Sequence, residues 1–353
     1  MSDETLEKLI SGYMATAQPQ YNFNWQGGEP LLMGAGFYKK VIELQKKHGK
    51  RGSVVVNTLQ TNNTVISDEL AGHFAEYNFL LGVSLDGPAR FHDIHRTYPG
   101  GRGSHAEVLK GIECLNRNKV EFNALTLVTS ANAGRAQEVY GYLRGLGLKF
   151  HQYIPCVEFD GHGNPENFAV TGAQWGGFIC GIYDEWIKKD VYDVSVRLFD
   201  SVLSVLTGHE ATVCQMRDSC CQYFVVEYNG DVYPCDFFVE KDRKLGNIME
   251  DSWEKIAESR LYLDFGKLKS ACDEKCPGCG YFRFCRGDCL KYRHSGGSGF
   301  ADASWLCDGW KMFYTHALPG FKKIASELQQ HAKQSTKITG LSQGRNPEAT
   351  IPR

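Results

Sequence analysis

The first 113 residues of this 353-residue chain contain no cysteine, because the first of its 13 cysteines is Cys114. A metal site built from thiolates therefore has no ligands in that region. The chain also has no apolar run close to the roughly 20 residues that cross a bilayer. Its opening segment, MSDETLEKLISGYM, is too charged for a signal peptide or a membrane anchor. We therefore expect no membrane partner and a cytoplasmic location, where thiols stay free for metal.

An excess of charge of one sign is also lacking. Lys and Arg number 39 against 41 Asp and Glu, so the formal net charge is −2, and no run of Lys or Arg stands out. A general nucleic-acid binder carries a basic patch or stripe, so we expect no nucleic-acid partner. The length allows two domains, or one barrel with an appendage.

What the chain does have is cysteine in its C-terminal half, in two groups with close spacing. The first group in the chain is Cys214, Cys220 and Cys235. The second has the spacing C-x2-C-x5-C-x3-C-x17-C and consists of Cys276, Cys279, Cys285, Cys289 and Cys307. Thiolates this close in sequence bind soft metal centres, because successive turns of a loop bring their sulfurs together.

The spacing favours iron–sulfur clusters over zinc. A four-cysteine zinc site usually uses two C-x2-C pairs, and this sequence has one, between Cys276 and Cys279. A structural zinc site stays open as the alternative. The remaining cysteines fall outside the pattern, and we expect small core residues there: Cys114, Cys156, Cys180, Cys221 and Cys272.

From residue 21 to about 155 the chain alternates β-rich runs with amphipathic helical stretches. The predicted strands are 21–25, 53–58, 79–86, 120–128 and 148–154. The predicted helices lie near 36–48, 67–77, 105–117 and 133–146, after a leading helix at 3–17. This alternation predicts parallel strands with crossover helices, in a barrel or a doubly wound sheet.

The later part of the chain is expected to be helical first and then to form a hairpin. Two helices are predicted within 173–208. The run 223–233 predicts a β-hairpin whose Asn229-Gly230 suits a type I′ turn, and it ends just before Cys235 and Asp236. Taken alone, Asp236 is better explained as a solvated carboxylate at the end of a hairpin than as a catalytic group.

Polar and glycine residues follow several predicted strands, where barrel enzymes carry their chemistry. Two glycines allow close approach of a ligand to the backbone, and a carboxylate can accept hydrogen bonds from an ammonium group, although a tight turn would use the same residues. The residues concerned are Gly27, Gly28 and Glu29 after the first strand, Gln60 and Asn62 after the second, Ser84 and Asp86 after the third, and Arg96 beyond it.

The spacing Cys220-x9-Gly230-x4-Cys235, together with the second cysteine group, resembles the SPASM domain of radical S-adenosylmethionine (SAM) enzymes. The resemblance implies two auxiliary 4Fe-4S clusters. Its first cluster would be held by Cys214, Cys220, Cys235 and Cys289. Its second would be held by Cys276, Cys279, Cys285 and Cys307.

From about residue 3 to 325 the chain further resembles the anaerobic sulfatase-maturating enzymes, through QGGEP, LQTNNT, VSLDGP with HDIHR, FHQYIPCVE and YPCDFF. That family oxidises a cysteine or serine of an unfolded sulfatase peptide to Cα-formylglycine, with electrons from a low-potential donor such as flavodoxin or ferredoxin. The resemblance implies that Asp236 is the proton acceptor. It implies SAM contacts at Gly28, Ser84, Arg96 and Val157.

The sequence departs from the family at one motif. The C-x3-C-x2-C signature that holds the radical 4Fe-4S cluster after the first barrel strand is absent, and Met1 aligns just after the place of that strand and signature in the family. We therefore expect an inactive or mis-started fragment, with the third cluster only in a full-length form. The expected α/β fold is a partial (β/α)6 barrel that lacks its first strand, at 1–172, then connecting helices at 173–208, a SPASM domain at 209–330 and a disordered tail at 331–353.

Two other functions stay open at this point. One is a different SPASM enzyme that modifies peptides, for instance by thioether or carbon–carbon crosslinks. The other is a non-catalytic iron–sulfur scaffold that binds a partner, which the absent signature would allow.

Overall fold

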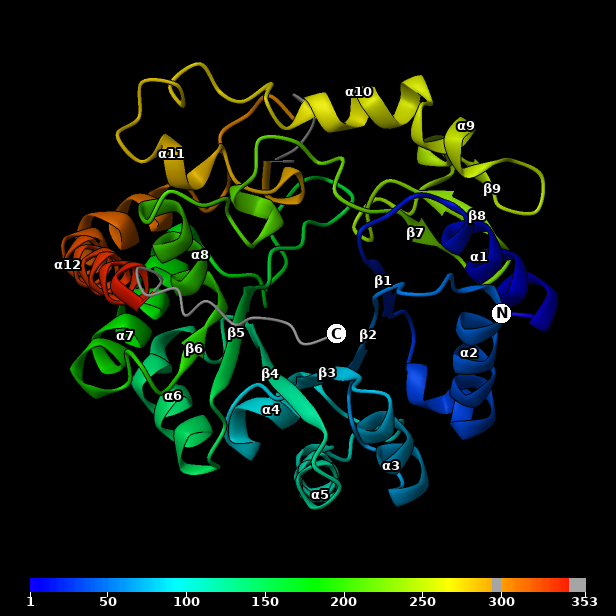
Figure 1. Cartoon of the computed structure of the whole chain (residues 1–353). Helices are drawn as coiled ribbons and strands as arrows, with labels where there is room; N and C mark the ends of the chain where they lie inside the picture. Colours follow the sequence, from blue (N-terminus) through cyan, green and yellow to red (C-terminus); the bar gives the residue numbers. More distant parts are fainter. Residues whose placement is uncertain (294–299, 343–353) are drawn as a thin grey trace, which may run out of the picture.

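The computed structural model describes residues 1–293 and 300–342, and the side chains up to residue 331. In this part of the chain, six parallel strands form one curved sheet in chain order (Figure 1). The strands are β1 (Tyr21–Trp25), β2 (Val55–Thr61), β3 (Leu80–Ser84), β4 (Glu121–Val128), β5 (Phe150–Pro155) and β6 (Ser195–Val196). Each neighbouring pair is parallel, so all strands end at the same edge of the sheet.

Helices connect the strands and lie outside the curved sheet (Figure 1). They are α1 (Asp3–Ala15), α2 (Gly34–His48), α3 (Asp68–Glu76), α4 (Ala89–His95), α5 (His105–Arg117), α6 (Ala136–Gly145), α7 (Gly172–Lys189) and α8 (Arg197–Leu206). Local sequence sets several of their starts: Ser2 and Ser67 cap α1 and α3, and Thr171 forms a capping box with Gln174 at α7. The apolar side chains between helices and sheet form the main core.

The strand β6 was missed by the sequence prediction, which placed two helices in 173–208. Those helices exist as α7 and α8, but Ser195–Val196 between them pairs with β5. A strand of two residues shows no alternation, so no pattern identifies it. Val196 is fully buried, so tertiary packing rather than local propensity makes this strand.

The C-terminal region has short elements. Its antiparallel sheet has the order β7 (Val225–Val226), β8 (Asp231–Tyr233) and β9 (Gly246–Asn247), and its helices are α9 (Trp253–Ala257), α10 (Arg260–Leu268), α11 (Phe282–Cys285) and α12 (Cys307–Ser342). The predicted hairpin is therefore present, but its turn is not type I′. Gly230 has a φ of 88°, whereas Asn229 stays out of the left-handed region and its Oδ1 accepts a bond from Asp231 N at 3.1 Å.

This region spans the open side of the sheet, from the β1 edge to the β6 edge (Figure 1). At one end, the Trp253 ring lies 6.1 Å from the ring of Tyr13 on α1. At the other end, Arg283 Nη2 donates to the carbonyl of Val205 on α8 at 2.7 Å. The cysteine-bearing segments are thereby held over the edge where the barrel strands end.

The last helix differs from the prediction of a disordered tail at 331–353. Helix α12 continues to Ser342, while residues 343–353 lie outside the described residues. The segment HAKQ at 331–334 contains Ala, Lys and Gln, which favour a helix, so the helix continues past the predicted boundary. Within residues 1–293 and 300–342, no helix combines the length and the apolar character needed to cross a bilayer.

Candidate functional site

The loop after β1 begins the site. Gly27 has a φ of 98° and Gly28 a φ of 54°, so both occupy the left-handed region that favours glycine. A Cβ atom at either position would meet no other atom within 4 Å. The glycines are therefore required by backbone conformation, and the loop presents its main chain to open space at the strand-end edge.

Glu29 ties this loop to the end of β2. Its Oε1 accepts bonds from Leu31 N at 2.9 Å and Thr61 Oγ1 at 2.7 Å, and its Oε2 accepts one from Asn62 N at 2.8 Å. A carboxylate has about four acceptor positions. Three protein donors therefore occupy most of this predicted ammonium acceptor, and its evident task here is to fix two loops.

The residues predicted after β2 differ in their surroundings. The Asn62 Oδ1 accepts bonds from Thr64 N at 3.0 Å and Thr64 Oγ1 at 2.8 Å, which shapes the turn. The side chain of Gln60 is exposed, on the same face of β2 as Thr58. Gln60 is thus the freer of the two predicted groups.

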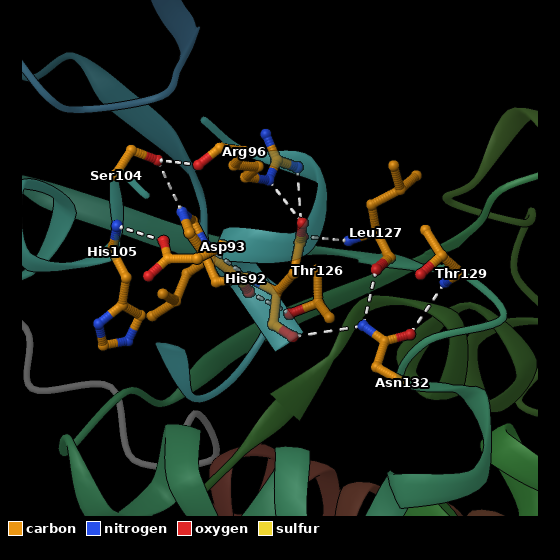
Figure 2. A network of polar contacts seen from close by, with 11 residues as sticks. His92, Asp93, Arg96, Ser104, His105, Thr126, Leu127, Thr129 and Asn132 are labelled. Carbon is orange, nitrogen blue, oxygen red and sulfur yellow. Dashed lines mark hydrogen bonds and ion pairs between the residues drawn. The ribbon is translucent and has the colours of Figure 1, made fainter. Parts of the chain in front are cut away.

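Arg96 is held by the carboxylate of Asp86, which lies in the loop after β3 (Figure 2). Arg96 Nε lies 2.5 Å from Asp86 Oδ2, and its Nη2 lies 3.2 Å from Asp86 Oδ1. Asp86 is buried and its Oδ1 also accepts a bond from Leu127 N at 2.8 Å, which fixes its position. A bidentate pair of this kind orients the guanidinium, and the donors it leaves over can meet a carboxylate or hydroxyl of a ligand.

Behind this pair lies a neutral histidine that the sequence analysis did not single out. His92 Nδ1 accepts a bond from Asp86 N at 3.3 Å, and its Nε2 lies 3.1 Å from Ser104 Oγ (Figure 2). Burial lowers the pKa of His92 to about 4, although the charge of Asp86 opposes this. The imidazole is therefore uncharged near pH 7, and it supports the loop that carries Arg96.

The other two predicted SAM contacts lie at the same edge. Ser84 is the last residue of β3, and Val157 follows β5 by two residues; both are buried. Gly28, Ser84, Arg96 and Val157 therefore all follow or end strands at one edge of the sheet. Their place at one edge results from the parallel order of the strands, which the sequence pattern predicted.

Asp236 faces this edge from the C-terminal region. Its Oδ1 accepts a bond from Tyr223 Oη at 2.7 Å, and its Oδ2 accepts one from Gln26 Nε2 at 3.2 Å. The Cys235 thiol lies 3.4 Å from Asp236 Oδ1. Gln26 directly precedes Gly27, so one exposed carboxylate joins the barrel loop to the cysteine region. A merely solvated hairpin end would not make these contacts.

The sequence analysis missed Gln26 and Tyr223 as partners of Asp236. The only available signals were the place of Gln26 beside the glycine pair and that of Tyr223 at the start of the predicted hairpin. Neither signal says which side chains meet, since Gln26 and Asp236 are 210 residues apart.

The thiols predicted for the first cluster lie beneath the hairpin. Cys220 and Cys235 pack against one small apolar cluster. Burial raises the pKa of Cys235 to about 12 and that of Cys220 to about 11. Burial also raises the pKa of Cys289, and the charge of Cys214 adds to the shifts of both Cys220 and Cys289. Cys214 is therefore within electrostatic range of these two thiols.

The thiols predicted for the second cluster gather around Cys307, at the start of α12. Burial raises the pKa of Cys276 to about 11 and raises that of Cys285 further, and the charge of Cys307 adds to both shifts. Burial raises the pKa of Cys307 as well, with a smaller contribution from Cys279. One further thiol, Cys272, hydrogen-bonds Cys276 and is only partly buried, so it is not the core residue that the pattern suggested.

The chemistry of these donors fits iron–sulfur clusters. Two sets of four thiols suit two 4Fe-4S clusters, whose irons are held by thiolate. Within the described part of the chain, no three Cys, His, Asp or Glu side chains converge as a single metal ion requires.

Comparison with known proteins decides the family. The model of the SPASM family, described as an iron–sulfur cluster-binding domain, matches residues 218–280. The chain is 36% identical to the serine-type anaerobic sulfatase-maturating enzyme of Bacteroides thetaiotaomicron, over 98% of this chain and 87% of that protein. The chain belongs to the anaerobic sulfatase-maturating enzymes.

Other members agree with this assignment. The cysteine-type enzyme of Clostridium perfringens is 33% identical over 93% of this chain and 90% of that protein. A solved structure described as native anSMEcpe with bound AdoMet and Cp18Cys peptide has a TM-score of 0.88 at 33% identity, with 93% of this chain and 92% of that chain covered. Streptococcus suis SuiB, at 15% identity and a TM-score of 0.61, shares the fold.

The predicted family, α/β radical SAM fold, SPASM domain and oxidoreductase class are thereby confirmed. The kinds of cofactor, SAM and 4Fe-4S clusters, are those of this family. The matched SPASM segment includes Cys220, Cys235, Cys276 and Cys279. In this sequence the spacing C-x3-C-x2-C occurs at Cys272, Cys276 and Cys279, within the SPASM segment, and residues 1–113 contain no cysteine.

Proposed function

We propose that this chain serves the oxidation of a cysteine or serine side chain in an unfolded sulfatase peptide to Cα-formylglycine, with Asp236 as the proton acceptor. One observation carries the proposal: Asp236 is bonded to Gln26 beside the glycine loop and lies next to the predicted cluster ligand Cys235. A base in that position lies between the SAM edge and the first cluster, where the target side chain must lie.

The cysteines of the C-terminal region would hold the two auxiliary clusters, and the strand-end edge of the barrel would hold SAM. We assign Cys214, Cys220, Cys235 and Cys289 to one auxiliary cluster, and Cys276, Cys279, Cys285 and Cys307 to the other. We assign SAM to Gly27, Gly28, Gln60, Ser84, Arg96 and Val157, while Glu29 and Asn62 fix the loops that surround it. When bound, SAM supplies hydrogen abstraction at the substrate Cβ, and the auxiliary clusters accept the electron that remains.

The chain's own part in the reaction is positioning and proton transfer. The Asp236 carboxylate accepts the proton of the substrate thiol or hydroxyl, within hydrogen-bond reach. Loss of this proton, of one Cβ hydrogen atom and of one electron leaves a carbon–sulfur or carbon–oxygen double bond. For serine that bond is the aldehyde; for cysteine, water replaces sulfur, which leaves as hydrogen sulfide. Tyr223 and Gln26 hold the carboxylate by their hydrogen bonds.

The partners follow from this chemistry. We propose a low-potential electron donor such as flavodoxin or ferredoxin, and a cytoplasmic location that keeps the thiols reduced. The barrel part at 1–172 would bind SAM, and the SPASM part at 209–330 would hold the clusters. The helices at 173–208 would connect these two parts. The small patch of exposed apolar side chains beside Asp236, at Phe237 and Val239, supports contact with a peptide.

The test of this function is Asp236→Asn. It is made in a version that also carries a C-x3-C-x2-C segment before Met1, because that motif provides the thiolates of the radical cluster. We expect SAM cleavage to continue while the yield of formylglycine falls about 100-fold or more, as for loss of a general base. Mass spectrometry of the peptide and chromatography of 5′-deoxyadenosine measure the two quantities.

The control is Asp242→Asn, an exposed carboxylate of the same region. It should change neither quantity. An undiminished formylglycine yield in Asp236→Asn, at normal iron content, would remove Asp236 from the reaction. Failure of both proteins to oxidise a Cys-x-Pro-x-Arg peptide would favour a different peptide modification.

A further inference from the structure

Two cations are buried among the cysteines without an anionic partner. The exposed fraction is 1% for Lys269, the residue directly after α10, and 0% for Arg293, in the 3-10 turn Leu290–Arg293. Lys and Arg are almost never fully buried unless they are paired. Yet neither forms an ion pair with any carboxylate among the described side chains, whereas many exposed cations of the chain do.

The hydrogen bonds of both groups go to backbone carbonyls. Lys269 Nζ donates to the carbonyl of Gln215 at 2.8 Å and to that of Asp288. Arg293 donates from Nε to the carbonyl of Gly287 at 2.6 Å and from Nη2 to those of Lys269 and Arg286 at 2.9 and 3.1 Å. Carbonyls satisfy the donors, but they do not neutralise the charge.

These carbonyls belong to the segments that carry the predicted cluster ligands. Gln215 follows Cys214 directly, Arg286 follows Cys285, and Asp288 precedes Cys289. The two cations thus fix the backbone on both sides of the thiols. They draw the first and the second cysteine set toward one buried region.

The buried carboxylate of Asp288 does not neutralise both buried cations. Burial lowers the pKa of Lys269, and the charge of Asp288 opposes this shift. The Asp288 Oδ2 also accepts bonds from Ser304 Oγ at 2.6 Å and Trp310 Nε1 at 2.7 Å. The segment HSGGSG at 294–299, whose structure is not described, contains no acidic residue. Two buried positive charges therefore face one buried carboxylate, and a buried charge requires an opposite charge nearby.

The thiols themselves can provide the missing negative charge. The ammonium of Lys269 is within electrostatic range of Cys214, Cys220, Cys285 and Cys289, which include members of both sets. Thiols become thiolates when they bind iron, and a 4Fe-4S cluster with four thiolates carries net negative charge. Each further electron makes that charge more negative.

We infer that Lys269 and Arg293 form a buried cationic pair that balances the thiolates of the auxiliary clusters and raises the reduction potential of the first cluster. A nearby fixed positive charge stabilises the reduced state more than the oxidised state. The pair thereby favours electron transfer into the cluster beside Asp236. This last step rests on the proposed function, whereas the effect on the potential does not.

The test separates the charge of Lys269 from its hydrogen bonds. Lys269→Gln keeps N–H donors and removes the charge, Lys269→Arg keeps both, and Lys267→Met is a control at an exposed position of the same helix. The chain as it exists is reconstituted anaerobically with iron and sulfide. Iron per chain and the midpoint potentials of the clusters are measured, the latter by redox titration followed by electron paramagnetic resonance.

We expect a lower midpoint potential in Lys269→Gln, and unchanged values in Lys267→Met and close to unchanged values in Lys269→Arg. Loss of iron from Lys269→Gln with full iron in Lys269→Arg supports the inference equally, because the two differ in charge. An unchanged potential in Lys269→Gln at full iron overturns it. So does loss of iron from both variants, since shape rather than charge would then matter.

No substrate enters this measurement, so its result is independent of the test on Asp236. A normal formylglycine yield in Asp236→Asn would end the proposed proton transfer and leave the cationic pair unaffected. A protein that takes up zinc in place of iron would end the inference about the potential.

Discussion

The barrel part and the cysteine-rich part of this chain are stabilised in different ways. The barrel has one large core, in which Leu81 and Val83 of β3 are fully inaccessible. The C-terminal sheet has strands of two or three residues, and its apolar clusters are small, one of them built on Val232, Ile248 and Ile256. In their place it has thiols and buried cations.

From this difference we infer which part of the chain needs its cofactors to fold. Burial of apolar surface stabilises a domain whether or not a ligand is bound, in proportion to the area removed from water. A region with little core depends on metal binding, whose free energy then becomes folding free energy. We therefore expect the barrel to be stable by itself and the cysteine region to be stable only with its clusters.

Removal of iron should have the largest effect, because it should unfold the cysteine region and leave the barrel folded. After chelation of the reconstituted protein, residues 209–330 should lose protection from hydrogen exchange, while β3 and β4 keep theirs. Exchange measured by mass spectrometry of peptides gives both values in one experiment. Cys285→Ser should weaken the region in the same way, whereas Cys180→Ser, outside both sets, should not. Full protection of the C-terminal region without iron would contradict the idea.

A substitution in the apolar core should test whether the barrel depends on that core for its stability. Leu81→Ala removes a fully buried side chain and should lower the free energy of unfolding of the barrel by about 3 kcal/mol. Leu80→Ala, at an exposed position of the same strand, should change it by less than about 0.5 kcal/mol. Denaturant unfolding measures both. Equal effects of the two variants would show that the Leu81 side chain does not contribute to the core as described above.

The smallest expected effect concerns acid. The pKa of His92 is lowered from 6.5 to about 4 by burial, so the unfolded chain binds its proton first as the pH falls. The contribution of neutral His92 to the free energy of unfolding is present above pH 6.5 and is lost progressively toward pH 4. The free energy of unfolding should fall by about 1 kcal/mol between pH 6.5 and 5.5. Unfolding of the barrel should therefore become easier over this range.

The matched variant is His92→Gln, which does not titrate. Its free energy of unfolding should fall less between pH 6.5 and 5.5 than that of the unaltered protein, measured by denaturant unfolding at each pH. An identical slope in both proteins would mean that His92 is not the group responsible. His151, whose pKa burial lowers to about 4 as well, would account for the slope that remains.

Several elements were predictable because their signals are local. The runs that became β1 to β5 alternate with amphipathic helices within a few residues of chain, and Gly27 and Gly28 follow the first of them. The hairpin before Cys235 was predictable for the same reason. Its turn was not, because Asn229 bonds the Asp231 backbone instead of taking the left-handed conformation.

The rest depended on residues that meet only in the folded chain. Strand β6 is too short to show a pattern, and its pairing with β5 makes it. Nothing in the sequence around Glu29 shows that three protein donors occupy its carboxylate. Burial of Lys269 is equally invisible, because a lysine at the end of an amphipathic helix ordinarily lies in water.

By itself, then, the sequence determined the α/β alternation, the glycine loop and the cysteine spacing, since each is written within a short stretch of chain. Only the tertiary structure decided that Gln26 bonds Asp236, that Asp86 orients Arg96, and that two cations lie unpaired among the thiols. The physical reason is distance along the chain. A hydrogen bond or a buried charge depends on which segments fold against each other, and periodicity within one segment does not contain that information.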